Sequence, residues 1–410
     1  MRIVFLAIGD ELLRGESREG NGAVLSDRLG ARGVRLDQIR VLRDDFETIA
    51  SALQDLCRTP TLIVVSGGLG PTDDDFTRAA VARAVGVEVV RDESVLDGLR
   101  AWYQARGRTM AEANHRQADF PQGAEVLANL HGTAPGFTLV HGAARIACLP
   151  GVPREFAAML DDHLDDLLQR SGVATLHRHE ATFRLFGIPE SDLQVLLSRL
   201  PHWSAATMRS LPSWPEIRLM LAPRGDSEAF ATLLTHVRGA LGTRIYSERR
   251  EDTHAAATLR ALVVRGATLA VAESCTGGLI GHLLTEVPGA SATLLVDTVT
   301  YADDAKREFL GVAAGTLETH GAVSEQTARE MAEGVRNRSG ATVAVATTGI
   351  AGPAGGTDAK PVGTVFVAVA GPDGTVVRGV RYVGIDRSRF KLSVAHLALA
   401  ELRSWALRQG

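Results

Sequence analysis

A serine and a cysteine stand side by side where a predicted buried strand gives way to a predicted helix. Residues 272–279 read AESCTGGL, and apolar side chains recur at helical spacing after them. The hydroxyl of Ser274 either caps this helix or reacts as a nucleophile, and an isolated serine at such a place is more often a cap. The neighbouring Cys275 would be the stronger nucleophile as a thiolate, but an inert thiol if it is buried.

Lysine is rare in this chain, and two of its three lysines lie in motifs that could form a reaction site. Lys306 ends the segment DTVTYADDAK, Lys360 follows the glycine-rich segment TTGIAGPAGG, and Lys391 has the setting of an ordinary surface residue. A chain that otherwise uses arginine can retain a lysine where a group must lose a proton near neutral pH. A serine nucleophile needs such a base, and amides of a glycine turn or helix start can stabilise the resulting oxyanion.

Residues 66–77, SGGLGPTDDDFT, lead from another predicted buried strand through glycines into a helix. Unhindered backbone amides beside a helix N-terminus are typical of a phosphate site, yet the three aspartates at 73–75 would repel phosphate. A divalent cation between carboxylates and phosphate removes this conflict. The alternative is that one aspartate caps the helix and the others are solvated, and the motif alone does not decide between the two.

The composition is that of a globular protein with two or three domains. Of the 410 residues 45% are hydrophobic and 22% charged, with 44 basic against 48 acidic residues. This balance lowers the expectation of direct nucleic-acid or membrane binding. Three cysteines without metal-ligand spacing indicate a reducing compartment, and we recognise neither a signal peptide nor a membrane span, so we expect a cytoplasmic protein.

The elements that must position these residues alternate strand and helix in both terminal parts of the chain. Residues 1–170 and 249–410 show the pattern of parallel sheets with crossover helices, and residues 171–248 that of a small α+β connector without a recognisable site. The charged segment 247–252 predicts a linker. We therefore expect an α/β protein: two three-layer α/β domains with largely parallel sheets, joined by a small α+β connector domain. Strands that carry the motifs are predicted at 2–8, 61–65, 268–272, 293–300 and 342–346.

Four C-terminal motifs resemble, in order and spacing, the nicotinamide-nucleotide amidase domain of the CinA (competence/damage-inducible protein A) family. They are AESCTGGL, VTYADDAK, GAVSE and TTGIAGPAGGTDAKPVGTV, which is far more specific than a lone glycine loop. The resemblance implies hydrolysis of the amide of nicotinamide mononucleotide to nicotinic acid mononucleotide and ammonia, without a cofactor.

The same resemblance assigns roles to individual residues of this domain. Ser274 would be the nucleophile, Lys306 its base and Tyr301 a neighbouring catalytic group, while Glu273 would be either an acid or a carboxylate that orients the lysine. The family often carries Ser-Asn after the tyrosine, where this chain has Ala302 and Asp303. The implied substrate contacts are Thr276, Gly277, Gly278, Thr348, Gly349 and Lys360.

The N-terminal motifs resemble the N-terminal domain of the same family, which is similar to molybdopterin-binding proteins. This resemblance implies a pyrophosphatase that acts on ADP-ribose and depends on a divalent metal, Mg²⁺, Mn²⁺ or Co²⁺. The implied metal-ligating or catalytic residues are Glu11, Asp45, Asp74 and Asp75. The implied substrate contacts are Gly67, Gly68, Gly70, Asn114, Arg116 and Arg154.

Two other functions stay open at this point. The N-terminal domain could bind a pterin or nucleotide without catalysis, although the clustered aspartates favour catalysis. The chain could instead be a competence scaffold that recruits DNA-handling proteins. The resemblance and the connector favour a homodimer, with nicotinamide mononucleotide and ADP-ribose as small-molecule ligands.

Overall fold

The computed structural model describes residues 1–175 and 180–408, and it contains two compact units, Met1–Arg178 and His179–Gly410. The first unit holds one large sheet, and the second holds two sheets, so the predicted connector and the predicted amidase domain share a unit. Within the described ranges, no helix is long and apolar enough to cross a membrane.

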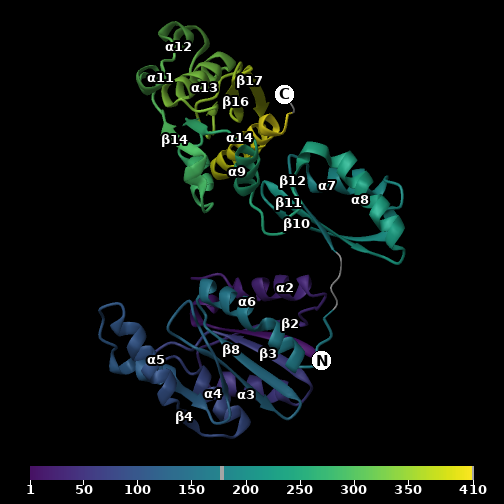
Figure 1. Cartoon of the computed structure of the whole chain (residues 1–410), viewed down its shortest axis with the longest axis vertical. Helices are drawn as coiled ribbons and strands as arrows, with labels where there is room; N and C mark the ends of the chain where they lie inside the picture. The colour runs from purple at the N-terminus through teal and green to yellow at the C-terminus, as the bar shows by residue number, and fades with distance from the viewer. Residues whose placement is uncertain (176–179, 409–410) are drawn as a thin grey trace. The chain divides into compact units, whose positions relative to one another are not determined.

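A six-stranded sheet forms the middle layer of the first unit, in the order β2-β1-β3-β8-β7-β6. Its first four strands are parallel, and β7 and β6 are antiparallel. Helices α2 and α6 cover one face and α3 and α4 the other (Figure 1). The bounds are β1 Arg2–Ile8, β2 Gln38–Leu42, β3 Thr61–Ser66, β6 Glu125–Leu127, β7 Gly136–His141, β8 Ala144–Leu149, α2 Asn21–Ala31, α3 Phe46–Cys57, α4 Thr77–Val85 and α6 Pro153–Arg170.

Five further elements complete the first unit. They are α1 Asp10–Leu13, β4 Val89–Arg91, α5 Glu93–Gln104, η1 Glu112–Ala118 and β5 Asp119–Pro121. The strands β1, β3 and β8 are apolar and almost wholly buried because helices pack on both of their faces.

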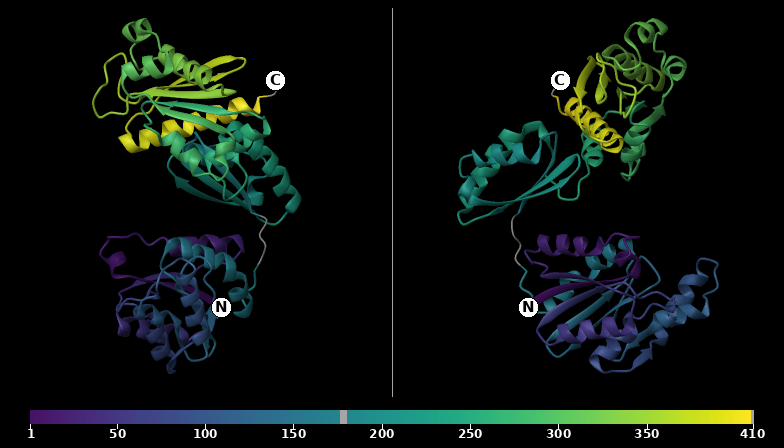
Figure 2. Two further views of the ribbon diagram at one scale, coloured as in Figure 1. Left: turned by 60° about the vertical axis from the view of Figure 1, so that its left-hand side comes forward. Right: turned by 180° about the vertical axis from the view of Figure 1, so that it is seen from behind.

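The smaller sheet of the second unit is antiparallel, in the order β10-β11-β9-β12. Alternate side chains of β9 and β11, such as Phe183 and Leu219, pack against helices α7 and α8, which lie on one side of this sheet (Figure 2). Arg184, Phe186 and Glu216 occupy the intervening positions, which face the opposite side. The bounds are β9 Ala181–Phe186, α7 Glu190–Ser198, η2 Trp203–Ala205, β10 Ala206–Ser213, β11 Glu216–Pro223, α8 Ser227–Leu241, η3 Gly242–Arg244 and β12 Ile245–Ser247.

The larger sheet of this unit has the order β14-β13-β15-β16-β17, with the first three strands parallel and the last two antiparallel. Helices α9, α10 and the long α14, yellow in Figure 2, pack on one face, and α11 and α13 pack on the other. The bounds are α9 His254–Val264, β13 Leu269–Glu273, α10 Leu279–Thr285, η4 Ala290–Ala292, β14 Leu294–Val299, α11 Asp303–Leu310, α12 Ala314–His320, α13 Glu325–Ser339, β15 Val343–Gly349, β16 Thr364–Gly371, β17 Gly374–Arg381 and α14 Arg387–Leu407.

The α/β class with largely parallel sheets is confirmed, and the segment predicted as a linker at 247–252 joins β12 of the small sheet to α9, which packs on the larger sheet. The charges of this segment are paired: Glu248 binds Arg238 at 2.8 Å, and Asp252 binds both Ser247 and Arg260. The segment is therefore a fixed connection between β12 and α9.

Two carboxyl groups meet where β13 and β14 end. Glu273 is fully buried and accepts hydrogen bonds of 2.9 Å from the backbone N–H groups of Gly278 and Gly281. The carboxylate of Asp297 lies against Gly281, and a Cβ atom placed on Gly281 would be only 1.9 Å from its oxygen. Burial and the nearby Glu273 carboxylate raise the pKa of Asp297 to about 7. At neutral pH Asp297 therefore holds a proton for about half of the time.

This proton makes the stability of the second unit depend on pH. The folded protein holds it up to about pH 7, whereas an unfolded chain releases it near pH 4, so its stabilising contribution is lost as pH rises between these values. Asn cannot ionise, so Asp297→Asn should unfold a few degrees above the unmodified protein at pH 8, and this advantage should be clearly smaller at pH 5. Thermal denaturation at both pH values checks this.

The matched control is Asp304→Asn, which removes an exposed carboxylate from helix α11. It should show no pH-dependent difference from the unmodified protein. Parallel behaviour of Asp297→Asn and the unmodified protein at both pH values would contradict the proton held by Asp297.

Candidate functional site

The turn between β13 and α10 contains Ser274, of which only 8% is exposed. Helix α10 begins at Leu279 and its N-cap residue is Gly278, so Ser274 is not a helix cap. Gly277 and Gly278 both have positive φ angles, 62° and 86°, which a side chain would strain. The turn thus presents the serine hydroxyl without using it to cap the helix.

The backbone amides at the start of α10 are partly occupied. Gly278 and Gly281 donate their N–H groups to Glu273, so these two amides serve the protein's own carboxylate. We expected helix-start amides to form an oxyanion hole, and these two amides are not available for that role. Glu273 itself braces the turn, which is a structural role.

Lys306 lies in the first turns of α11 with its side chain 1% exposed. Its Nζ atom donates hydrogen bonds of 3.1 Å to the carbonyl oxygens of Thr300 and Tyr301. Burial lowers the pKa of Lys306, although Asp303, whose carboxylate is 3.6 Å away, opposes that shift. A neutral amine has two N–H groups, and the two carbonyls satisfy both, which leaves the nitrogen lone pair available to accept a proton.

The lysine loop and the serine turn are adjacent. The backbone N–H of Thr300 donates to the carbonyl of Glu273 at 2.9 Å, which joins the end of β14 to the end of β13. Cys275 is 5% exposed, and burial raises the pKa of its thiol to about 12, a shift that the charge of Lys306 opposes. The amine therefore lies within electrostatic reach of the turn, and the thiol of Cys275 is inert.

The other predicted contacts of this site lie around β15. Thr276 is buried, and its hydroxyl bonds that of Thr347 at 2.8 Å. Thr348 donates to the carbonyl of Ala322 at 2.7 Å, and Lys360 donates to that of His320. The side chains of Thr276 and Thr348 thus hold the motifs together, and Gly349 ends the same strand.

Two residues of α14 reach this region, and the sequence analysis missed both. Arg387 donates to the hydroxyl of Tyr301 at 2.8 Å and to the carbonyl of Gly352 at 2.9 Å. The Nζ atom of Lys391, which was expected to be an ordinary surface residue, lies 3.5 Å from where a Cβ atom of Gly277 would be, and the residue is half-buried. Two features of the sequence could have identified Lys391: lysine is rare in this chain, and residue 391 follows Arg387 by four residues, about one helical turn.

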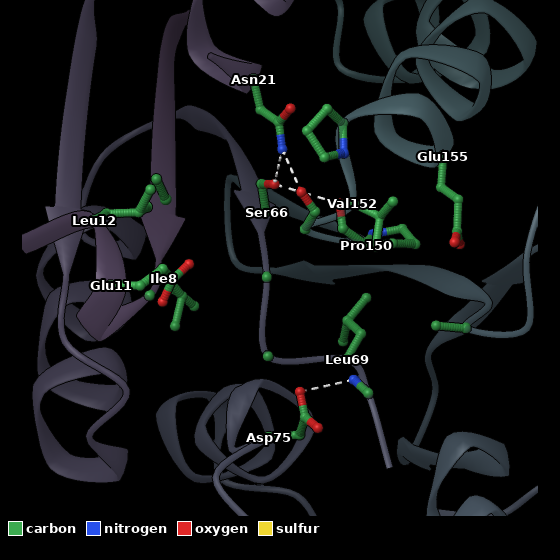
Figure 3. Close-up of a pocket in the computed structure, with 18 of the residues that line it drawn as sticks. Ile8, Glu11, Leu12, Asn21, Ser66, Leu69, Asp75, Pro150, Val152 and Glu155 are labelled. Carbon is green, nitrogen blue, oxygen red and sulfur yellow. Dashed lines mark hydrogen bonds between the residues drawn. The ribbon is translucent and has the colours of Figure 1, made fainter. Parts of the chain in front are cut away.

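In the first unit a cavity of about 550 Å³ lies at the carboxyl ends of β1, β3 and β8 (Figure 3). Gly67, Gly68 and Gly70, predicted as substrate contacts, are among the residues that line it. A Cβ atom on Gly67 would lie 2.4 Å from the carbonyl oxygen of Ile8, and one on Gly68 would lie 2.2 Å from the hydroxyl of Thr77. Only glycine allows the chain to pass so close to both neighbours.

The cavity wall is strongly acidic. Asp44 accepts a hydrogen bond of 2.9 Å from the backbone N–H of Asp10, and burial, together with the charges of Glu11, Asp10 and Asp74, raises its pKa. Of the described lining residues, Arg18 is the one that is basic. The acidic lining residues are Glu11, Glu19, Asp44, Asp74, Asp75 and Glu155. Carboxylate oxygens are the ligands that divalent cations such as Mg²⁺ and Mn²⁺ prefer, although the described residues place no three of these carboxylates within 4.8 Å of one another.

Two predicted metal ligands have other roles. Asp45 lies outside the cavity lining and caps α3, accepting the N–H of Thr48 at 2.8 Å. Asp44, and not its neighbour Asp45, is therefore the candidate metal ligand of this loop. Asp75 lines the cavity, but it accepts hydrogen bonds of 2.8 Å from the N–H groups of Gly70, drawn in Figure 3, and of Thr72, so it holds the glycine loop in shape.

Three of the predicted substrate contacts lie away from the cavity lining. Asn114 is buried and bonds the hydroxyl of Tyr103, and Arg116 binds Asp73 at 3.1 Å. Arg154 is exposed beside Glu155, which does line the cavity. These three assignments are therefore not supported by the geometry.

Asn21 is a lining residue that the sequence analysis did not place in the site. It donates to the hydroxyl of Ser66 at 2.8 Å and to the carbonyl of Gly151 at 2.9 Å (Figure 3). Its amide oxygen is buried without a hydrogen-bond partner among the residues that the structure describes. The signal was an asparagine at the start of a helix that follows an acidic loop.

Comparison with known proteins matches the two terminal parts of the chain to two different domain families. Residues 4–170 match the probable molybdopterin binding domain, and residues 251–406 match the CinA C-terminal domain. A solved structure of the competence/damage inducible protein CihA from Agrobacterium tumefaciens is 44% identical, with a TM-score of 0.36, and covers 37% of this chain and 96% of its own.

Full-length relatives settle the family. A CinA-like protein of Syntrophus aciditrophicus is 41% identical over 418 residues, covering 99% of this chain and 98% of its own length. Another, from Geobacter sulfurreducens, is 41% identical over 411 residues and covers 98% of both chains. Identity at this level along almost the whole of both chains means that this chain belongs to the CinA family.

Proposed function

We propose that the second unit hydrolyses the amide of nicotinamide mononucleotide to nicotinic acid mononucleotide and ammonia. The observation that carries this proposal is the buried amine of Lys306 beside the turn that presents Ser274. A lysine with a lowered pKa and a free lone pair is a competent base for a serine hydroxyl.

The proposed reaction has two halves. Oγ of Ser274 attacks the amide carbon while its proton passes to Nζ of Lys306, and the C–N bond then breaks as ammonia leaves with that proton. Water attacks the resulting ester, Lys306 accepts a proton from the water, and the proton returns to Oγ as the acid is released. Proton transfer to Lys306 in each half requires the neutral amine at the start.

The cations around the turn suit a substrate with a phosphate group. Lys391 approaches Gly277, and Arg387 holds the hydroxyl of Tyr301, whose side chain is exposed. We assign Arg387 and Lys391 to the 5′-phosphate and Tyr301 to positioning of the substrate. Lys360 lies against the backbone of His320 and would act there as a further positive charge.

Replacing the serine and its neighbour separates the two possible nucleophiles. Ser274→Ala should lower ammonia release from nicotinamide mononucleotide by at least about a thousandfold, because no nucleophile remains. Cys275→Ala should retain most of the rate, since the buried thiol takes no part. A coupled ammonia assay, with mass spectrometry of the nucleotide product, measures both.

A variant pair tests the base. Lys306→Arg should be about as inactive as Lys306→Met, because arginine stays protonated and cannot accept the proton of Ser274. The matched control is Lys391→Arg, which keeps the charge that we assign to phosphate binding and should retain kcat. Substantial kcat in Lys306→Arg would mean that Lys306 contributes only a charge.

We also propose that the first unit cleaves the pyrophosphate of ADP-ribose with the help of a divalent cation. Glu11, Asp44 and Asp74 would hold the cation, and it would screen the negative charge of the substrate when bound. The support is the cavity of about 550 Å³ whose wall joins a glycine-rich backbone to these carboxylates. The N–H groups of Gly67, Gly70 and Thr72 are already bonded within the protein, so the amides of Gly68 and Leu69 would orient the phosphates. The same cavity would serve the rival function of binding alone.

Two adjacent aspartates provide the test of this second activity. Asp74→Asn should reduce Mn²⁺-dependent cleavage of ADP-ribose by about tenfold or more while leaving ammonia release unchanged. The matched control is Asp73→Asn on the same loop, because Asp73 is exposed, binds Arg116 and lies outside the cavity lining. Liquid chromatography of the products follows the reaction. Binding of ADP-ribose without turnover in Mg²⁺, Mn²⁺ or Co²⁺ would favour the binding-only function.

A further inference from the structure

Three polar side chains from distant parts of the second unit converge on one point. They are Glu216 at the start of β11, His254 at the start of α9 and His396 within α14. Each offers one ligand atom, and these atoms all lie within 4.8 Å of one another. The two histidines are 2% and 6% exposed, so the cluster lies inside the unit.

The distances within the cluster fit a coordinated cation. The Nδ1 atoms of His254 and His396 are 3.2 Å apart, and Nδ1 of His396 is 3.7 Å from Oε1 of Glu216. Around a tetrahedral Zn²⁺ with bonds of about 2.05 Å, neighbouring ligand atoms are separated by roughly 3.3 Å. Small side-chain adjustments bring the three atoms to that spacing.

The hydrogen bonds of the protein alone leave the cluster incomplete. Oε1 of Glu216 is buried without a hydrogen-bond partner among the residues that the structure describes. The two Nδ1 atoms can share one proton, but 3.7 Å from Nδ1 of His396 is too far for a hydrogen bond to the carboxylate. A buried, unsatisfied carboxylate oxygen is costly, and a cation between the three atoms would satisfy all of them.

The other oxygen of Glu216 has partners of its own. The hydroxyl of Tyr246 lies near the Glu216 carboxylate and accepts a hydrogen bond of 2.8 Å from Nε of Arg184. Nη2 of Arg184 lies 3.9 Å from Oε2 of Glu216, and the ring of Tyr246 stacks on His254 with centroids 4.4 Å apart. This outer set fixes the ligand side chains in the way that surrounding residues orient the ligands of metal sites.

We propose that Glu216, His254 and His396 form a binding site for one divalent transition-metal cation of the zinc type. Imidazole and carboxylate ligands together suit Zn²⁺, Co²⁺ and Ni²⁺ rather than Mg²⁺ or Ca²⁺. The three protein ligands leave a fourth position for one water molecule. The cation fastens the small antiparallel sheet, through Glu216, to helices α9 and α14 of the larger sheet.

Titration of the full-length, chelator-treated protein with Co²⁺ is the decisive experiment. A tetrahedral site with two imidazole ligands gives an intense visible absorption band, whereas the oxygen-lined cavity of the first unit gives only the weak band of octahedral Co²⁺. We expect the intense band to saturate at one equivalent and to disappear on addition of Zn²⁺. Absence of an intense band in the unmodified protein would overturn the proposal, whatever the variants do.

Variants locate the site. His396→Gln and Glu216→Gln should each weaken Zn²⁺ binding by at least about tenfold in equilibrium dialysis with metal quantified by mass spectrometry. The control is His141→Ala, which removes an exposed histidine of the β7–β8 hairpin and should leave binding unchanged. Ammonia release and circular dichroism check that each variant is folded. Unaltered Zn²⁺ affinity in a folded His396→Gln protein would refute the assignment.

Discussion

Parallel pairing of β13 with β14 on one side and β15 on the other is the constraint on which the second unit depends. Because parallel strands end at the same edge, the pairing delivers Ser274, Thr300 and Thr348 to one place from segments far apart in the sequence. One hydrogen bond, from the N–H of Thr300 to the carbonyl of Glu273, fixes the lysine loop against the serine turn. Lys306 becomes buried as a result, and its burial is what favours the neutral amine.

Much of this arrangement could be predicted from the sequence. Buried strands such as β1 and β3 are short β-branched runs, and the glycines at 67, 68, 277 and 278 stand where close backbone approach or positive φ excludes other residues. The scarcity of lysine, together with the motif that it ends, singles out Lys306. These features are local, and local patterns of residue type report them directly.

The errors concern residues whose role depends on a partner from elsewhere in the chain. Asp44 and Asp45 are neighbours of the same type, and only the packing of β2 against α1 decides which faces the cavity and which caps α3. Lys391 acquires its setting from Gly277, and Glu216 from two histidines on α9 and α14. The residues next to these positions in the sequence give no sign of either contact. The connector was therefore predicted to contain no site.

The close approach of Asp297 to Gly281 also limits how this protein can vary. A methyl group at position 281 would occupy the space of the carboxylate, while the N–H of the same residue must still reach Glu273. A chain with alanine at 281 therefore requires a smaller residue at 297, and one with aspartate at 297 requires glycine at 281. The two sites are thus expected to change together, as a single compound position, among descendants of this sequence.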